Sequence, residues 1–293
     1  MSPLSRREFL LAGAGLAGLA VAGACGSDDG DDTVTARVSE PGDGATATTT
    51  AAAFSLVVAS FTHVAGIDER LTLALLTAER SGPLPIEGAV EVTVDGRPVE
   101  STVHSDGTPL PYLLVRHRFA EAGPAVVAAT YDGETGEAGV TVSDPAEVKV
   151  PYPGKPMISV PSPTTADALG VDPICTAEPA CPLHDVSLDA ALAEKRPLAV
   201  LFSTPARCQS RLCGPVLDTL LGQREAFADK VRFLHVEIYK ARTGSALAPT
   251  VSAYNLAAEP VLFLAGADGV VRERIDNAFD RVEAKAALER LGG

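Results

Sequence analysis

The chain has 293 residues, 46% of them hydrophobic, and a formal net charge of −14 from 24 Lys and Arg against 38 Asp and Glu. This length favours two domains, and the hydrophobic share excludes a wholly disordered chain. Binding along nucleic-acid phosphates needs clustered basic residues, so the acidic balance excludes a nucleic-acid partner. We attribute the acidity to solubility.

Residues 1–24 have the character of an export signal. Residues 5–11 read SRREFLL and resemble the bacterial twin-arginine signal, whose pattern is S-R-R-x-F-L-K. The apolar stretch from Phe9 to Ala24 is too short and too weakly hydrophobic for a membrane span of about 20 apolar residues. We therefore expect a removable signal peptide and export by the twin-arginine pathway.

Cys25 is the candidate lipidation site. The preceding Ala22-Gly23-Ala24 resembles a lipobox, with Ala22 where Leu is usual, and it also fits ordinary signal peptidase. Residues 25–53 are rich in Asp, Gly, Thr, Ala and Ser, which predicts a disordered tether. A tether directly after a lone Cys favours a lipid anchor, which would place the protein at the extracytoplasmic face of the bacterial cell membrane.

Residues 54–144 alternate apolar and polar residues between short turns, which predicts β-strands. The expected strands include residues 54–61, 71–75, 90–94, 99–104, 113–119, 127–131 and 138–142. About seven short strands in this length predict an immunoglobulin-like sandwich. The region contains neither Cys nor Trp and shows no chemistry of its own. Its expected role is that of a spacer, a docking surface or a support.

Residues 145–173 hold seven prolines, which predict an extended, semi-rigid linker. In residues 174–293 the pattern changes. Ser187 is a plausible N-cap, residues 198–202 read as a buried strand, and residues 214–228 as a helix. A strand at 231–238, a helix at 249–256, strands at 260–264 and 270–275, and a helix at 280–291 complete the expected order.

This order and several motifs resemble the thioredoxin-like fold family. Cys213-Gly214-Pro215 is similar to the start of the C-G-P-C motif, and Pro260 stands where the family has a cis-proline. The resemblance covers about residues 183–293 and implies an α/β thioredoxin-like domain after the all-β one. By the same resemblance, Pro260 would lie opposite the cysteine loop and help to hold an extended substrate strand.

The sequence departs from the family pattern at the redox motif. Val216 replaces the second Cys of C-G-P-C, so the partner of Cys213 must be Cys208, in a Cys-x4-Cys arrangement. Leu201 stands where thioredoxins have a buried acid, and Glu259 precedes Pro260 where a neutral residue is usual. The chain has no Trp to precede the motif.

Cys208 and Cys213 can meet only if residues 208–212 form a loop, because five residues of one helix would place the side chains about 140° apart. Pro215 belongs in a first helical turn, so the helix should begin near Cys213. The helix dipole would lower the pKa of a thiol there. Arg207 and Arg211 could lower the pKa further, unless they belong to a solvated loop. Which sulfur attacks stays open.

Cys175 and Cys181 lie in a Pro-rich approach before any regular element. Their short separation and the expected oxidising location predict a structural disulfide, with a second disulfide between Cys208 and Cys213. Cross-pairing of the two pairs stays open.

Two functions remain in view. The first is a thiol-disulfide oxidoreductase with Cys208, Cys213 and Pro260 as catalytic residues, acting on protein thiols or disulfides or on an electron-donor protein. The second is a non-enzymatic binding or scaffold protein in which both cysteine pairs are structural.

Other chemistries fit less well. A peroxiredoxin-type peroxidase is excluded because Leu201 and Pro205 occupy its motif positions before Cys208. A copper chaperone would need a Cys-x3-Cys pair and a His, whereas the spacing here is four residues and His235 lies within a predicted strand. His184, three residues after Cys181, is expected at the surface. We predict neither a cofactor nor a metal site.

Overall fold

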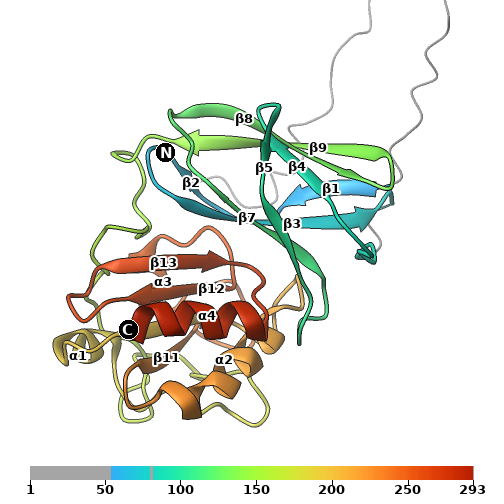
Figure 1. Cartoon of the computed structure of the whole chain (residues 1–293). Coiled ribbons are helices and arrows are strands. Elements are labelled where there is room, and N and C mark those ends of the chain that lie inside the picture. The colour runs from blue at the N-terminus through green and yellow to red at the C-terminus, as the bar shows by residue number, and fades with distance from the viewer. Residues whose placement is uncertain (1–53, 80–81, 293) are drawn as a thin grey trace, which may run out of the picture. The chain divides into compact units, whose positions relative to one another are not determined.

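The computed structural model describes residues 54–79 and 82–292. The predicted signal peptide (1–24), the tether (25–53) and its lipidated Cys25 lie outside these residues. The described part of the chain is mostly β, with several sheets and a few helices (Figure 1). No helix within it is long and apolar enough to cross a bilayer.

The N-terminal, β-rich region consists of two sheets that share one core. In strand order, the first sheet is β1 (Phe54–Val58), β3 (Glu69–Thr77), β7 (Tyr112–His117) and β6 (Ser101–His104). The second is β2 (His63–Val64), β9 (Glu134–Ser143), β8 (Gly123–Tyr131), β4 (Glu91–Val94) and β5 (Arg97–Val99). Leu71 and Leu73 of the first sheet and Val92 and Val127 of the second belong to the same buried cluster. The predicted alternation is confirmed, while the immunoglobulin-like assignment stays a prediction.

The C-terminal domain contains a four-stranded sheet in the order β11 (Arg232–Glu237), β10 (Leu198–Ser203), β12 (Val261–Ala265) and β13 (Val271–Asp276). β10 and β11 are parallel, and β12 runs antiparallel to both β10 and β13. Its helices are α1 (Leu188–Ala193), α2 (Cys213–Phe227), α3 (Pro249–Tyr254) and α4 (Arg281–Gly292). This is the element order predicted for a thioredoxin-like domain.

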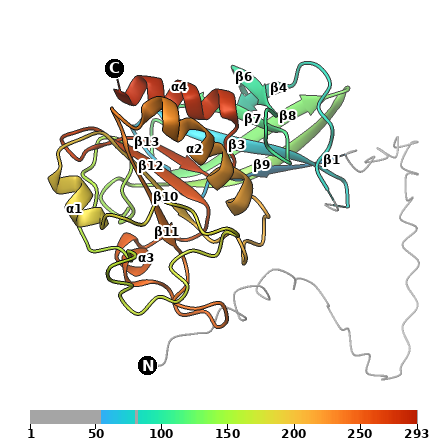
Figure 2. The same cartoon turned by 90° about the horizontal axis from the view of Figure 1, so that it is seen from below.

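Both faces of this sheet are covered, because every residue of β10 is buried. Leu198, Val200 and Phe202 pack in one core with residues of α1 and α3. Ala199 and Leu201 point to the opposite face, into a core that α2 and α4 contribute to. Figure 2 shows α2 and α4 side by side, away from α3. The continuous apolar run that predicted this strand therefore serves two cores at once.

Residues 145–173 contain neither helix nor strand, but they pack on the C-terminal domain. Val150, Met157 and Val171 are buried in the core that also holds α1 and α3. The Met157 N–H donates to the Gly269 carbonyl at 2.8 Å, and the Asp172 N–H donates to the Lys240 carbonyl at 2.7 Å. Burial of its apolar residues fixes this proline-rich segment along the domain and leads the chain to Cys175.

The β-rich region also touches the domain that follows it through a buried polar group. The Arg70 guanidinium of β3 donates to Glu283 of α4 at 2.7 Å, and the Tyr112 hydroxyl donates to the same carboxylate. Tyr112 packs in a small cluster with Leu212, the residue before Cys213.

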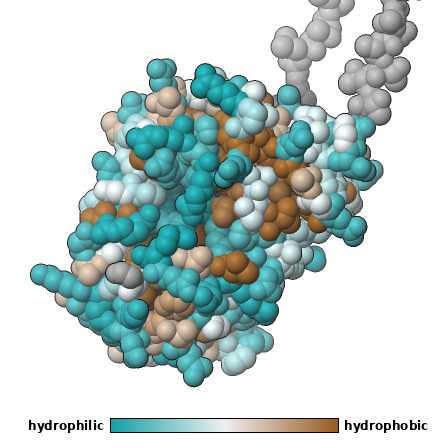
Figure 3. All heavy atoms as spheres, viewed as in Figure 1, coloured by the Kyte–Doolittle hydropathy of each residue, from teal (hydrophilic) through white to brown (hydrophobic). Residues whose placement is uncertain are grey.

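Hydrophilic side chains cover much of the face drawn in Figure 3, with apolar patches between them.

Candidate functional site

The predicted redox loop lies between the end of β10 at Ser203 and the start of α2 at Cys213. The helix begins where Pro215 predicted, so Cys213 is its first residue and Cys208 lies in the loop before it. Cys213 is fully buried, whereas Cys208 is partly exposed. An exchange reaction needs one accessible sulfur, and only Cys208 of this pair offers it.

Hydrogen bonds converge on the Cys208 sulfur. The Cys213 backbone N–H donates to it at 3.3 Å, from the first turn of α2. The Ser210 hydroxyl lies 3.2 Å from the same sulfur. Donors aimed at a sulfur favour its thiolate, and the positive end of the helix dipole acts in the same direction.

The two thiols of this pair differ in acidity. The hydrogen bond with the Cys213 side chain, joined by that of Ser210, lowers the pKa of Cys208 to about 5. Burial, the Cys208 hydrogen bond and the nearby Glu259 carboxylate raise the pKa of Cys213 well above the ordinary value. These opposite shifts favour the thiolate on Cys208 and the protonated thiol on Cys213 at neutral pH.

The arginines expected to acidify this loop have other surroundings. The Arg207 guanidinium lies 3.8 Å from the centre of the Tyr239 ring and donates to the carbonyls of Ala241 and Gly244. Arg211 is exposed. The low pKa of Cys208 arises from hydrogen bonds to its sulfur and not from either arginine.

Pro260 begins the segment that leads into β12, and the Glu259–Pro260 peptide bond is cis, as the resemblance implied. Glu259 acts electrostatically on Cys213, so this segment lies close to the buried sulfur. The Tyr239 hydroxyl lies 3.5 Å from Glu259 Oε1. The structure thus brings Cys208, Cys213 and the segment of Pro260 to one part of the domain, although a role of Pro260 in catalysis stays a prediction.

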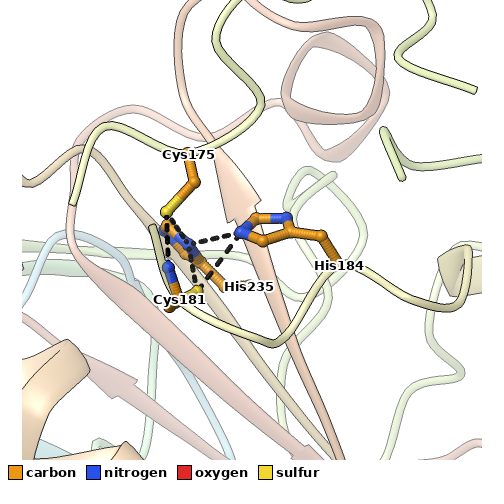
Figure 4. A group of neighbouring side chains, drawn as sticks. All are labelled: Cys175, Cys181, His184 and His235. Atoms are coloured by element: carbon orange, nitrogen blue, oxygen red, sulfur yellow. Dashed lines mark hydrogen bonds between the residues drawn. The ribbon is translucent and has the colours of Figure 1, made fainter. Parts of the chain in front are cut away.

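The other two cysteines form a second, separate group with two histidines (Figure 4). Cys175, Cys181, His184 and His235 each offer one ligand atom, and all four atoms lie within 4.8 Å of one another. All four side chains are buried. Three come from the segment between the proline-rich stretch and α1, and His235 comes from β11.

The local fold explains how these side chains meet. β11 is an edge strand of the sheet, and its His235 N–H donates to the Leu183 carbonyl at 3.1 Å. This bond fixes the segment along the strand edge and places His184 beside His235. Cys175, Cys181 and Leu183 pack in the core on the α2 and α4 face.

The structure holds neither of the two predicted disulfides. The described cysteines are all free and neither pair is at disulfide distance, so the Cys175–Cys181 and Cys208–Cys213 bridges are both absent from this structure. A Cys208–Cys213 bridge would be the oxidised state of that pair and stays a prediction. His184 Nε2 lies 3.3 Å and His235 Nδ1 lies 3.4 Å from the Cys181 sulfur. His184, expected at the surface, is only 4% exposed.

A hydrogen-bonded path joins the two cysteine groups. The Thr176 hydroxyl, next to Cys175, donates to the buried Glu237 carboxylate at 2.7 Å and accepts from the Ala206 N–H at 3.2 Å. Ala206 lies in the loop that carries Cys208. The Ser203 hydroxyl, at the start of the same loop, lies 2.9 Å from His235 Nε2. These hydrogen bonds connect the segment of Cys175 and the strand of His235 to the loop that carries Cys208.

Sequence reasoning missed the histidine group for an identifiable reason. His235 was considered only with Cys208 and Cys213, because those cysteines carried the motif. The available signals were His184 three residues after Cys181 and a histidine within an apolar strand. What joins them is the pairing of residue 183 with the edge of β11, and no local pattern encodes such a pairing.

No protein-family model and no curated protein sequence matches this chain. Among solved structures, it is similar to a thiol:disulfide interchange protein of the thioredoxin family from Chlorobium tepidum TLS, with 15% identity and a TM-score of 0.33 over 48% of this chain and 97% of that one. The C-terminal domain of a protein from Bacteroides thetaiotaomicron, named for thiol-disulfide oxidoreductase activity, gives 12% identity and 0.33 over 49% and 97%.

A third similar structure is the PKD domain of the human VPS10 domain-containing receptor SorCS2, with 17% identity and a TM-score of 0.19 over 44% of this chain and 100% of that one. All three TM-scores lie below 0.5, so these likenesses carry no argument. The thioredoxin-like assignment rests on the strand order and helix placement of the C-terminal domain.

Proposed function

We propose that this protein is a thiol-disulfide oxidoreductase in which Cys208 attacks and Cys213 resolves. The observation that carries the proposal is the asymmetry of the pair. Cys208 is partly exposed with a pKa lowered to about 5, while Cys213 is buried with a raised pKa. A structural staple needs no such difference, whereas a nucleophile must be an accessible thiolate.

The reaction reduces a substrate disulfide with the two thiols of the protein. The Cys208 thiolate attacks one substrate sulfur, an S–S bond forms between them, and the other substrate sulfur leaves as a thiolate. Cys213 then loses its proton to solvent or to the leaving thiolate and attacks the Cys208 sulfur. The second substrate thiol departs, and a Cys208–Cys213 disulfide holds the two oxidised sulfurs. The reverse sequence oxidises a substrate dithiol.

The acidity of Cys208 favours the reverse sequence, in which the protein oxidises a substrate dithiol. A stabilised thiolate stabilises the reduced form of the protein, and proteins of this kind are the stronger oxidants among exchange-competent pairs. We therefore expect this pair to lie nearer the oxidising end of the range of about −270 to −120 mV. Its partners would be exported proteins with cysteines, or a protein that exchanges electrons with the pair.

The location of the protein is part of the same proposal. A twin-arginine-type signal in residues 1–24 and a lipid on Cys25 would hold the protein at the extracytoplasmic face of the bacterial membrane. The tether of residues 25–53, an immunoglobulin-like region over residues 54–144 and the segment 145–173 would then precede the redox domain of residues 174–293. This location is supported by the SRREFLL motif of residues 5–11 and by Ala22-Gly23-Ala24 before Cys25.

The redox proposal is tested by trapping on the full chain. With Cys213→Ser, oxidised glutathione should leave a stable mixed disulfide on Cys208, visible as an added glutathione in the intact mass. The matched Cys208→Ser variant should leave Cys213 unmodified, because Cys213 is buried. Equilibration of the unaltered protein in glutathione buffers gives the potential. A pair that resists reduction below about −300 mV, with no trapped adduct, overturns the proposal and leaves a binding protein.

The anchor is tested separately on the protein purified from its native membrane. Intact mass should show a diacylglyceryl group on an N-terminal Cys25. A product that begins at an unmodified Cys25 and fractionates free of membranes contradicts the anchor but leaves the redox proposal standing.

A further inference from the structure

We propose that Cys175, Cys181, His184 and His235 bind one Zn²⁺ ion in a closed tetrahedral site. The residue types are those of structural zinc sites, which take two thiolates and two imidazoles. Three ligands come from one short segment and the fourth from the neighbouring strand, so the ion would fasten that segment to the sheet. Figure 4 shows the two sulfurs and the two rings facing a common centre.

Four of the six distances between the ligand atoms fit a tetrahedron of the size zinc requires, and all six are at most 4.8 Å. With Zn–S bonds of about 2.3 Å and Zn–N bonds of about 2.0–2.1 Å, the S–N edges should be about 3.6 Å and the N–N edge about 3.4 Å. His235 Nδ1 lies 3.7 Å from the Cys175 sulfur, 3.4 Å from the Cys181 sulfur and 3.2 Å from His184 Nε2. His184 Nε2 lies 3.3 Å from the Cys181 sulfur. Each value is within about 0.3 Å of its tetrahedral edge.

The proton positions also favour a cation at this centre. His235 Nε2 lies 3.1 Å from the Ser203 carbonyl, which can only accept, so Nε2 of the neutral ring carries the proton. His235 Nδ1 then carries a lone pair and no proton, and this atom faces the two sulfurs and His184 Nε2. A lone pair can accept only one good hydrogen bond, so hydrogen bonding alone cannot satisfy three heteroatoms around it. A metal ion satisfies all of them at once.

The surrounding protein supplies a hydrogen-bond partner for one of the two imidazoles and the charge balance that a zinc site needs. The bond from His235 Nε2–H to Ser203 orients the ring, as outer partners of zinc-bound histidines do. His184 Nδ1 is buried without a partner and remains the one unsatisfied outer atom of the group. Two thiolates and two neutral rings around Zn²⁺ sum to zero charge, so the buried centre avoids the cost of an uncompensated ion. Four protein ligands leave no open position, which makes the site structural and not catalytic.

The test uses the full chain, reduced and loaded with Zn²⁺ or with Co²⁺ as a spectroscopic probe. After dialysis against a weak chelator, one Zn²⁺ should remain per chain. X-ray absorption fine structure at the zinc edge, measured on the unaltered protein, should show two sulfur and two nitrogen atoms bound to the ion. The Co²⁺ form should show the intense visible bands of a tetrahedral site and a sulfur-to-cobalt charge-transfer band.

Matched variants assign the ion to its residues. A Cys175→Ser and Cys181→Ser double variant should lose the bound ion, whereas a Cys208→Ser and Cys213→Ser double variant should keep it. The X-ray absorption measurement uses the unaltered protein, so it identifies the bound atoms even if a variant fails to fold.

Four results would each overturn the zinc assignment. The first is retention of the ion by the Cys175/Cys181 double variant with its loss from the Cys208/Cys213 double variant, and the second is an octahedral Co²⁺ spectrum. The third is preferential retention of Cu⁺ when both metals compete at equal free concentration, and the fourth is a Cys175–Cys181 disulfide in metal-free native protein. An ion on Cys208 and Cys213 would also change the trapping experiment, whereas the other results leave that experiment unaffected.

Discussion

The two cysteine pairs of the C-terminal domain have similar spacings and different surroundings. Cys175 and Cys181 are separated by five residues, and Cys208 and Cys213 by four. The first pair is buried against two imidazoles. The second lies at the start of α2, with one sulfur partly exposed and acidified by hydrogen bonds. The chemistry of a cysteine pair is thus decided by what faces the sulfurs and by water access, and not by the spacing.

The largest expected difference between the two cysteine pairs is in their rates of alkylation. At pH 6 a thiol of pKa about 5 is about 90% thiolate, against about 0.3% for an ordinary thiol. The lower intrinsic nucleophilicity of an acidic thiolate removes most of this advantage, which leaves Cys208 about tenfold faster than an ordinary exposed thiol. Cys175 and Cys181 are buried and, under the zinc proposal, would be metal-bound, so they should react at least about 100-fold more slowly than Cys208.

Iodoacetamide labelling of the reduced, zinc-loaded protein, read peptide by peptide, measures these rates. The Cys208 rate should reach its plateau above about pH 6 and fall to half at a pH near 5. A half-point near 8.5 would contradict the assignment of Cys208 as the thiolate.

The pH dependence of stability gives a second, smaller contrast. The pKa of Cys208 is about 5 in the folded protein and about 8.5 in the unfolded chain, so its thiolate stabilises the fold above pH 8.5. This stability is lost as the pH falls through 5. The sulfur is partly exposed, so we discount the full shift and expect about 2 kcal/mol.

Denaturant unfolding of the reduced protein at pH 8.5 and pH 5 tests this contribution. The unaltered protein should lose about 2 kcal/mol more between the two pH values than Cys208→Ser does, because titrating groups outside the coupled Cys208–Cys213 pair are common to both. Equal losses in the two proteins would show that the thiolate contributes nothing to stability.

Thr176 allows the connection between the two groups to be broken. Thr176→Val removes the hydroxyl that donates to Glu237 and accepts from the Ala206 N–H, so we expect a loss of about 1–3 kcal/mol in the free energy of unfolding. Thr176→Ser keeps the hydroxyl and should lose much less. Faster proteolysis of the Cys208 loop in the Val variant would accompany the loss. Identical stabilities of the Val and Ser variants would contradict this role of the hydroxyl.

The parts of the fold that follow from local patterns could be predicted from the sequence. The apolar run at residues 198–202, the turn at Asp268-Gly269 and Pro215 gave β10, the β12–β13 hairpin and the start of α2 correctly, because each depends on neighbours in the chain. The helix start in turn placed Cys208 in a loop. The identity of the thiolate could not follow, because it depends on the exposure of one sulfur and the burial of the other.

The histidine group lay beyond sequence reasoning because His235 is 51 residues from His184, and their meeting depends on the edge of a sheet. The hydrogen bond between residues 183 and 235 is a tertiary contact. The disulfide predicted for Cys175 and Cys181 was the sensible interpretation of short spacing in an exported chain. The structure has free cysteines there, with His184 Nε2 and His235 Nδ1 at 3.3 and 3.4 Å from the Cys181 sulfur, and that short spacing did not indicate either imidazole.

The smallest expected effect isolates the zinc group from the redox pair. Ser203→Ala removes the hydroxyl 2.9 Å from His235 Nε2 but keeps the Ser203 carbonyl as an acceptor. Removing an outer partner of a zinc ligand costs about 10–100-fold in affinity. Because one acceptor remains, we expect about tenfold weaker Zn²⁺ binding, measured by competition with a chromophoric chelator. Ser203→Thr keeps a hydroxyl and should bind zinc within about threefold of the unaltered protein. In both variants the Cys208 sulfur keeps its donors from Ser210 and Cys213, so its alkylation rate should not change. A Ser203→Ala protein with unchanged zinc affinity and a slower Cys208 would mean that Ser203 serves the redox loop and not the histidine.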